Sequence, residues 1–499
     1  MLSDRLKQKA KVGFALISGA LLPLAFAPYD MPAMAIVGLL FFLIALNKQD
    51  ARKSAWLGYA FGWGYFGHGV YWVYFSIHHF AHAPLWLAII ITLGMVAILA
   101  LYMALFAYLL NRFFQSNLLL RYLLAFPGLW VGLEACRAVF FTGFPWLSLG
   151  YSQIDTWLAG WAPIFGVLGV SWFLALTSGA IFCVVYCQKI HKIMTIILVF
   201  SSWSSGWALQ KINWVEPAGE PLKTVLLQGN IPQEIKWDRD FRQTSLDIYM
   251  QMTKRQRDAD IIVWPETAIP AFYHTVQHGY MQILKAEAQA YQSDIILGLP
   301  LMLEGTKDYY NSLHSVREPK DFYLKRHLVP LGEYIPLKPL SSIILGFMNI
   351  PLSDFSAGEE QQPLLQAGGY AFASSICYED IFQQTSIDGL PEAAYLVNVS
   401  NDTWFGDTIA PYQHFQMARM RALESGRYLL RSTNTGLTAI VNQRGEVTHQ
   451  APMFKRVALK GEMQPLKGAP PFVQGGWWLI YVLIVSVLLV GFLKRDRKE

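Results

Sequence analysis

Cysteine is scarce in this sequence, which has 4 in 499 residues. Three of them, Cys136, Cys183 and Cys187, lie in or beside long apolar runs, so Cys377 has no partner in the polar part of the chain. A disulfide framework is therefore not expected. An unpaired thiol in a polar, motif-rich region is instead a candidate nucleophile.

The sequence also lacks the usual signatures of nucleotide and metal sites. No glycine-rich run ends in Lys followed by Ser or Thr, and the segment TWFGD offers only Gly406, so nucleotide binding is not expected. His78, His79 and His82 lie in a short loop without acidic or cysteine partners, which favours a polar loop over a metal site. We therefore expect an activity that needs no cofactor and no metal ion.

Charged side chains are rare in the first part of the chain, and only twelve lie between Val12 and Gln210. With 54% hydrophobic residues and a mean hydropathy of +0.29, the chain is too apolar for one soluble domain. A helix of about 20 apolar residues crosses a bilayer. On this basis we predict eight spans, near residues 12–27, 31–46, 55–76, 85–111, 118–136, 160–186, 193–210 and 475–493. The predicted domains are therefore an N-terminal membrane domain over 1–215, a polar domain over 222–465 and a closing span.

Lysine and arginine residues in the short loops predict the orientation of these spans. If the N-terminus is cytoplasmic, most basic residues fall in cytoplasmic segments, namely 1–11, 47–54, 112–121, 187–192 and 494–499. The opposite short loops offer little besides Arg137. This asymmetry predicts that both termini are cytoplasmic and that the polar region is outside, in the periplasm of a Gram-negative cell. The net charge of +5 belongs to these loops and chain ends, so it does not indicate nucleic-acid binding.

The start of the chain leaves two alternatives open. Its basic residues, apolar run and Ala25-Phe26-Ala27 ending resemble a signal peptide. Immediate continuation into a second apolar stretch favours an uncleaved span, because cleavage would leave an odd number of spans and contradict the loop charges. The first two runs are short and are joined by Pro28, Tyr29 and Asp30, so a re-entrant pair is the alternative to two full crossings.

Residues 222–465 have a different pattern. Short apolar, β-branched runs that end in polar residues, Gly or Pro predict buried strands: TVLLQGN, DIIVWPE, DIILGLP, YAFASSICYE and AYLVNVSND. Polar stretches at 239–257, 277–291 and 411–427 predict helices between them. This alternation indicates an α/β domain whose sheets are covered by helices. Residues 336–368 are rich in Pro, Gly and Ser and have no clear period, which predicts loops and a candidate lid.

Three segments of this region carry side chains suited to acyl chemistry. Cys377 ends the apolar run FASSIC, and its thiol needs a neighbouring base or positive charge because the ordinary pKa of a thiol is about 8.5. Glu266, in IIVWPETAIP, ends a strand beside a rigid proline, where a partly buried carboxylate can accept the thiol proton. Lys325, in FYLKRHLVPLGEY, can stabilise an oxyanion. Singly, each also fits a structural role; together they indicate a catalytic set.

These three segments resemble the nitrilase, or carbon–nitrogen hydrolase, superfamily over residues 224–465. The resemblance implies an αββα sandwich with a Glu, Lys and Cys catalytic set. It also implies that Glu333, in LVPLGEY, is a second glutamate beside the lysine, and that Tyr378 and Glu379, which follow the nucleophile, are supporting residues. Leu331 stands where an aromatic residue is frequent in the superfamily, which affects local packing rather than the chemistry.

Over its whole length the chain resembles the apolipoprotein N-acyltransferase family, the membrane-embedded branch of that superfamily. Further matching stretches are QGNIPQEIKW, SNDTWFGD, HFQMARMRALESGR, RSTNTG and, in the membrane part, FTGFPWLSLGYSQ. From these stretches Trp237 and Trp404 are candidate substrate contacts. Arg137, near the end of a span, is a candidate for binding a phospholipid head group, because charged residues within membrane segments are functional candidates.

The resemblance implies a two-step acyl transfer. Cys377 attacks an ester carbonyl of a membrane phospholipid, with Glu266 as base and Lys325 at the oxyanion, which gives a thioester and a lysophospholipid. The α-amine of the S-diacylglyceryl-cysteine at the N-terminus of an apolipoprotein then attacks the thioester. The expected partners are thus a phospholipid donor, a diacylglyceryl apolipoprotein acceptor and the membrane itself, with the enzyme as a monomer.

Two other functions use the same residues or layout. An exported amidase or nitrilase would have the same catalytic set, with water resolving the thioester, but a single helix would suffice to anchor it. A transporter with a polar binding module is the other alternative. It is less favoured because ionisable residues within the predicted spans are so few.

Overall fold

The computed structural model describes residues 2–115, 117–186, 189–303, 305–317, 322–330, 332–334 and 354–493. Leu331, Cys187, the last six residues and most of the predicted lid, over 336–353, lie outside the described residues. The chain forms two compact units. Unit 1 comprises residues 1–74, 85–212 and 474–499, and unit 2 comprises residues 75–84 and 213–473.

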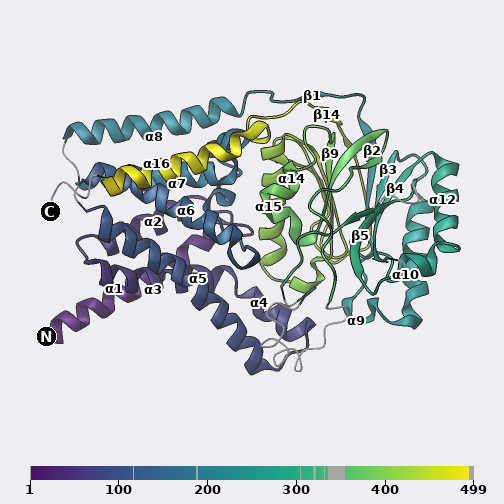
Figure 1. Cartoon of the computed structure of the whole chain (residues 1–499), viewed down its shortest axis with the longest axis horizontal. Helices are drawn as coiled ribbons and strands as arrows, with labels where there is room; N and C mark the ends of the chain where they lie inside the picture. The colour runs from purple at the N-terminus through teal and green to yellow at the C-terminus, as the bar shows by residue number, and fades with distance from the viewer. Residues whose placement is uncertain are drawn as a thin grey trace. The chain divides into compact units, whose positions relative to one another are not determined.

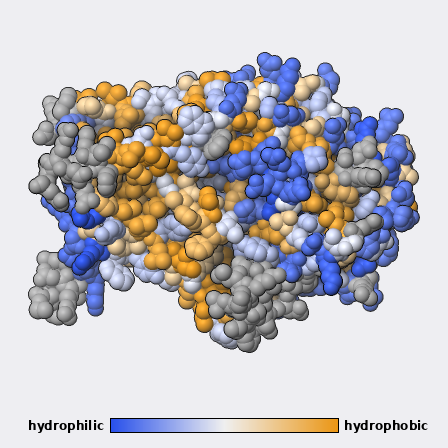
Figure 2. Space-filling view, viewed as in Figure 1, coloured by the Kyte–Doolittle hydropathy of each residue, from blue (hydrophilic) through white to orange (hydrophobic). Residues whose placement is uncertain are grey.

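Unit 1 is helical (Figure 1). Its longer helices are α1 (Leu2–Leu21), α2 (Ala33–Leu46), α3 (Ala51–Gly69), α5 (Leu85–Phe113), α6 (Phe126–Val139), α7 (Ala162–Tyr186), α8 (Lys189–Leu209) and α16 (Trp477–Leu493). Hydrophobic side chains, orange in Figure 2, gather over these helices, as expected where lipid rather than water is the solvent.

Among the described residues of unit 1, four helical stretches are long and apolar enough to cross a membrane: Leu85–Phe113, Leu120–Thr142, Trp157–Tyr186 and His191–Leu209. They correspond to four of the eight predicted spans. The apolar helices Ala33–Leu46 and Trp478–Val490 are shorter. The predicted span at 55–76 corresponds to α3, which ends at Gly69, the short α4 (Trp72–Phe75) and the start of a π-helical turn, Ser76–Phe80, and its membrane crossing stays a prediction.

Glycines let the helices of unit 1 approach closely. A Cβ added at Gly19 of α1 would lie 1.9 Å from the carbonyl oxygen of Phe61 on α3, and one added at Gly58 of α3 would lie 2.2 Å from that of Met103 on α5. Small residues at such contacts allow backbone-to-backbone packing, which substitutes for the hydrophobic effect inside a bilayer. The glycine-rich composition of α3 therefore reflects packing between its neighbours α1 and α5.

The described residues of unit 2 form two sheets of six strands each and a small sheet of β1 (Glu216–Pro217) and β14 (Leu466–Lys467). The first has the order β13-β2-β3-β4-β5-β6, with β2 (Leu222–Gln228), β3 (Ile261–Val263), β4 (Asp294–Met302), β5 (Tyr309–Ser315), β6 (Phe322–Leu324) and β13 (Val457–Met463). The second has the order β12-β11-β10-β9-β8-β7, with β7 (Leu365–Ala367), β8 (Tyr370–Ile376), β9 (Tyr395–Ser400), β10 (Leu429–Thr433), β11 (Ala439–Val441) and β12 (Val447–Gln450). Strands β2, β3 and β4 are parallel, as are β8, β9 and β10.

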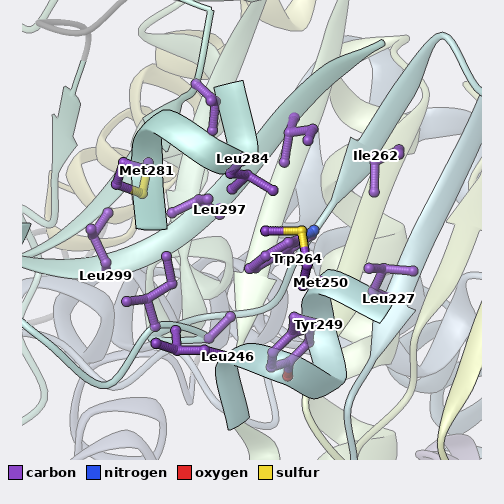
Figure 3. Packing of buried hydrophobic residues seen from close by; sticks show 14 of the residues in the cluster. Leu227, Leu246, Tyr249, Met250, Ile262, Trp264, Met281, Leu284, Leu297 and Leu299 are labelled. Carbon is purple, nitrogen blue, oxygen red and sulfur yellow. The ribbon is translucent and has the colours of Figure 1, made fainter. Parts of the chain in front are cut away.

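The two sheets pack face to face, with helices outside each (Figure 1). Between the sheets lies an apolar layer that includes Leu226, Val263, Ile376 and Val399. Helices α10 (Arg239–Lys254) and α12 (Tyr280–Tyr291) cover the first sheet, and Figure 3 shows their side chains packed around the buried Trp264. Helix α15 (Ala410–Ser425) covers the second sheet. Because both faces of the central strands are buried, the strands are nearly continuous apolar runs. The predicted αββα sandwich is confirmed.

The predicted elements of this region are present. Each of the five predicted strands is found, as β2, β3, β4, β8 and β9, and the three predicted helices are α10, α12 and α15. The catalytic candidates follow strand ends. Glu266 comes after β3, Lys325 after β6 and Cys377 directly after β8.

Candidate active site

Glu266 lies in a tight turn after β3 and is buried. Its Oε1 accepts a hydrogen bond from Asn311 Nδ2 on β5 at 2.7 Å, and the same oxygen lies 3.8 Å from Lys325 Nζ. Thr267, the next residue, has a left-handed backbone with φ of +46°. This conformation is unfavourable for a β-branched side chain, and strain of this kind gathers at functional sites.

Lys325 is almost fully buried, with 1% of its side chain exposed. Its ammonium lies 2.8 Å from both carboxylate oxygens of Glu333. Burial alone would lower the pKa of Lys325, but the charges of Glu333 and then Glu266 outweigh it and raise the pKa above its usual value. Asn311 also donates to Glu333 at 3.1 Å. One buried ammonium and one amide therefore hold two carboxylates in place.

Cys377 begins the short 3-10 helix Cys377–Ile381 and has a left-handed φ of +52°. Its carbonyl oxygen accepts hydrogen bonds from Asn398 Nδ2 at 3.5 Å and from His414 Nε2 at 3.3 Å. Burial raises the pKa of the Cys377 thiol well above its usual value, the charge of Glu266 raises it further, and Lys325 opposes the rise. The resting thiol is therefore neutral, and reaction requires a base.

Glu379 follows the nucleophile by two residues and has its own set of hydrogen-bond donors. Glu379 is fully buried and accepts hydrogen bonds from the backbone N–H groups of Arg326, His327 and Ile376 at 2.7 to 3.0 Å. It also accepts from Tyr323. Burial raises the pKa of Glu379, against the effect of Lys325 and these donors. Glu379 thus joins the lysine segment to the end of β8, and its supporting role in catalysis stays a prediction.

Behind Cys377 lies a buried ionic cluster that contains Asp380, Asp402, His414 and Arg431. The ring nitrogens of His414 contact Asp380 at 2.7 Å and Asp402 at 3.1 Å, and Arg431 pairs with both aspartates. Burial lowers the pKa of His414, but the neighbouring aspartates overcome this and raise it. His414 and Arg431 thus lie against both aspartates, and His414 also contacts the Cys377 carbonyl oxygen, so the cluster can hold the turn at Cys377.

Tyr378, Trp237 and Trp404 are the remaining residues of unit 2 that the sequence predicted for the site. Tyr378 is buried, with its ring 5.3 Å from that of Phe382. Trp237 is half-buried at the end of the short helix α9 (Gln233–Lys236). Trp404 lies in the 3-10 helix Asp402–Phe405, where its carbonyl oxygen accepts a hydrogen bond from Ser76 Oγ at 2.8 Å. Substrate contact by either tryptophan stays a prediction.

Arg137 belongs to unit 1 and is buried at the end of α6. Its guanidinium donates to the carbonyl oxygens of Phe144 and Trp146 and to Ser148 Oγ, in the loop that follows the helix. The nearby Glu134 accepts from Trp130 Nε1 at 2.9 Å and from the Leu149 amide at 2.8 Å. Both charged groups therefore hold this loop, and head-group binding by Arg137 stays a prediction.

Sequence reasoning missed several residues that contact the catalytic candidates, and two of them, Asn311 and Lys236, contact Glu266. Asn311 bridges Glu266 and Glu333 from the polar strand β5, and no sequence pattern marked it. Lys236 donates to the carbonyl oxygen of Glu266 at 3.1 Å. It lies within the matching stretch QGNIPQEIKW, directly before the predicted Trp237, so a lysine in that stretch was the available signal.

Comparisons with known proteins cover both parts of the chain. Residues 18–180 match the family described as Apolipoprotein N-acyltransferase N-terminal domain, and residues 226–465 match the family Carbon-nitrogen hydrolase. An Apolipoprotein N-acyltransferase from Methylococcus capsulatus is 44% identical and covers 97% of this chain and 96% of its own length. One from Coxiella burnetii is 40% identical and covers 96% of this chain and 99% of its own. A solved carbon-nitrogen hydrolase from Helicobacter pylori G27 is 15% identical, with a TM-score of 0.37, and covers 56% of this chain and 95% of its own.

Proposed function

Because this chain belongs to the apolipoprotein N-acyltransferase family, we propose that Glu266, Lys325 and Cys377 are the residues that carry out its acyl transfer. The family's reaction is the N-acylation of apolipoproteins, which completes lipoprotein maturation. We propose a membrane phospholipid as the acyl donor. The observation that best supports this assignment is the buried ammonium of Lys325 between the carboxylates of Glu266 and Glu333. The charges of Glu266 and Lys325 both affect the pKa of the Cys377 thiol, which ties the three groups to one site.

The first step forms the acyl-enzyme. The Cys377 sulfur attacks the ester carbonyl carbon of the phospholipid while the thiol proton passes to Glu266. The carbonyl π electrons move onto oxygen, where the Lys325 ammonium stabilises the negative charge. When the tetrahedral intermediate collapses, the C–O bond to the glycerol oxygen breaks and that oxygen takes the proton from Glu266. The products are a Cys377 thioester and a lysophospholipid.

The second step transfers the acyl chain. The neutral α-amine of the diacylglyceryl-cysteine attacks the thioester carbonyl carbon, and Lys325 again stabilises the oxyanion. Glu266 takes a proton from the attacking nitrogen and returns it to the departing Cys377 sulfur. The amide product leaves, and the thiol and carboxylate regain their starting states. Glu333 and Asn311 keep Lys325 and Glu266 oriented through both steps, since they form hydrogen bonds with these groups.

We further propose that the protein lies in the bacterial inner membrane with both termini cytoplasmic and residues 222–465, as the catalytic domain, in the periplasm. The basic residues in alternate loops and the four long apolar helices support this arrangement. Residues 1–215 and 475–493 then keep the site at the leaflet that holds both lipid substrates. Drawing an acyl chain into water would cost about 0.8 kcal/mol per CH₂. All the proposed catalytic groups come from one chain, which supports a monomer.

Product analysis with both substrates tests the function. Purified protein in detergent receives a phospholipid with a labelled acyl chain and a diacylglyceryl-cysteine peptide, and products are identified by mass spectrometry. We expect the label on the peptide amine, with Cys377→Ser inactive and Cys136→Ser, which changes a thiol of unit 1, active. Release of the label only as free fatty acid would instead indicate the hydrolase alternative, because water would then resolve the thioester.

A further inference from the structure

Lys236 is a second buried lysine at the candidate active site. It ends the short helix α9, and 3% of the residue is exposed. Its Nζ donates to the carbonyl oxygen of Glu266 at 3.1 Å and to Thr267 Oγ1 at 2.5 Å. Burial lowers the pKa of Lys236 to about 8, although the charges of Glu266 and Cys377 oppose that shift. A buried ammonium whose hydrogen-bond acceptors here are neutral is costly for stability, and such groups are usually functional.

The two acceptors of Lys236 belong to Glu266 and Thr267, and the backbone between these two residues is strained. Thr267 holds a left-handed φ of +46°, which a β-branched residue rarely adopts. Strand β4 also crowds this turn at Gly298, where an added Cβ would lie 2.6 Å from the Thr267 nitrogen and 2.8 Å from the Glu266 Cα. The Glu266–Thr267 peptide is thus contacted both by the backbone of β4 and by the ammonium of Lys236.

Helix α9 is itself tied to the nucleophile-bearing half of the sandwich. Asn401, which follows β9, donates to Gln233 Oε1 at 2.8 Å. Asn434, which follows β10, accepts from the Ile231 amide at 3.0 Å and donates to the Ile231 carbonyl at 2.7 Å. Because these segments follow β9, which neighbours β8, and β10, the next strand of the same sheet, the position of Lys236 depends on the sheet that carries Cys377. Lys236 therefore links the two halves of the catalytic set.

We propose that Lys236 is a positioning residue that clamps the strained Glu266–Thr267 peptide and so aims the Glu266 carboxylate at the thiol. This role rests on the proposed function of Glu266 as the base. Without the clamp, the turn relaxes toward an ordinary backbone conformation and the carboxylate swings away from Asn311 and Lys325. A displacement of about 1 Å at a reacting group can cost on the order of 100-fold in rate.

A mutant cycle with Thr267 tests the clamp. Lys236→Met removes both hydrogen bonds while keeping an unbranched side chain of similar length. Thr267→Gly removes the strain, because glycine adopts positive φ without penalty. The rate of Cys377 thioester formation from labelled phospholipid is measured under single-turnover conditions, and kcat and KM for the phospholipid are measured separately. Lys254→Met, on the exposed face of α10 with 48% of its side chain exposed, is the matched control.

We expect Lys236→Met to lower the thioester rate about 100-fold with KM nearly unchanged, and Thr267→Gly to lower it less than about fivefold. In the double variant the rate should recover at least about tenfold, because the strain that required the clamp is gone. A double variant no faster than Lys236→Met would overturn the proposal, as would a Lys236→Met rate equal to that of the Lys254→Met control.

A replacement variant and a wild-type control separate a failure of the clamp from a failure to fold and from a failure of the proposed function. If Lys236→Met does not fold, as judged by its thermal unfolding, Lys236→Gln and its combination with Thr267→Gly replace it, since the amide retains one donor group. Their expected order of rates is the same, and the same absence of recovery contradicts the clamp. If the wild-type protein forms no Cys377 adduct at all, the proposed function itself fails, whereas a normal wild-type adduct with no effect at Lys236 overturns only the clamp.

Discussion

Replacing Asn311 by aspartate tests the electrostatics of the site most sharply. Asn311 donates to Glu266 at 2.7 Å and to Glu333 at 3.1 Å, and 2% of the residue is exposed. In Asn311→Asp a third carboxylate occupies that place with almost the same shape. Three carboxylates instead of two then lie beside the ammonium of Lys325.

The magnitude follows from these distances. With an effective dielectric constant of about 20, a new charge would repel Glu266 by about 6 kcal/mol and Glu333 by about 5 kcal/mol. Protonating an ordinary glutamate at pH 7 costs about 4 kcal/mol, because its usual pKa is about 4.3. Repulsion exceeds that cost, so the three carboxylates take up a proton near neutral pH and share it. The variant therefore loses its free base at the pH where the wild-type protein works.

The assay is the pH profile of Cys377 thioester formation, followed from about pH 5 to 9. For Asn311→Asp we expect the acid limb to move upward by several pH units, with a rate at least about 10-fold lower at pH 7 that stays low up to pH 9. Asn311→Leu is the matched control: it also loses the amide donor, so its rate falls, but its acid limb should move upward far less because no charge is added. An unshifted limb in Asn311→Asp would refute the reasoning.

Three further predictions concern stability. Because the pKa of His414 is raised in the folded protein, its contribution to folding stability is complete below the unfolded pKa of about 6.5 and is lost as pH rises through the folded pKa. The thermal midpoint should therefore fall over that pH range in wild type but not in His414→Gln, and an equal fall in both proteins would contradict this. Tyr323→Phe removes a hydrogen bond to Glu379 and should cost about 1.5–3 kcal/mol in urea unfolding; no loss would show that the hydroxyl contributes nothing. Gly58→Ala should lower the thermal midpoint in detergent, because the added Cβ meets a carbonyl oxygen of α5. Gly67→Ala should not, because there is open space around Gly67, and equal effects of the two substitutions would contradict the close packing of α3.

Apolar patterning predicted the centre of the sandwich but not its polar strands. The parallel strands β3, β4, β8 and β9 are buried on both faces, so their sequences are continuous apolar runs that a single chain reveals. Strand β5, with the sequence YYNSLHS, and strand β10, with LLRST, lack such runs. Each strand places polar side chains inside the domain, where they form hydrogen bonds or ion pairs with residues distant in the sequence. A local sequence pattern contains no information about those distant residues.

The same difference separates the predicted site residues from the missed ones. Glu266, Lys325 and Cys377 follow strand ends within distinctive segments, so the sequence marks them. Asn311 and Lys236 act on those residues through hydrogen bonds that span 45 and 30 positions, and only the fold brings them together. In unit 1, the predicted span over 55–76 stays a prediction, and α3 within it is rich in glycine and aromatic residues that pack against neighbouring helices.

The most direct test of the central claim is to locate the acyl group on the protein. Wild-type protein is incubated with phospholipid alone, without an amine acceptor, and its mass and peptide map are recorded before and after treatment with neutral hydroxylamine, which cleaves thioesters. We predict one added acyl chain, on Cys377, removed by hydroxylamine and absent when Glu266 is replaced by glutamine. An acyl chain on any other residue, or none on the wild-type protein, would contradict the account.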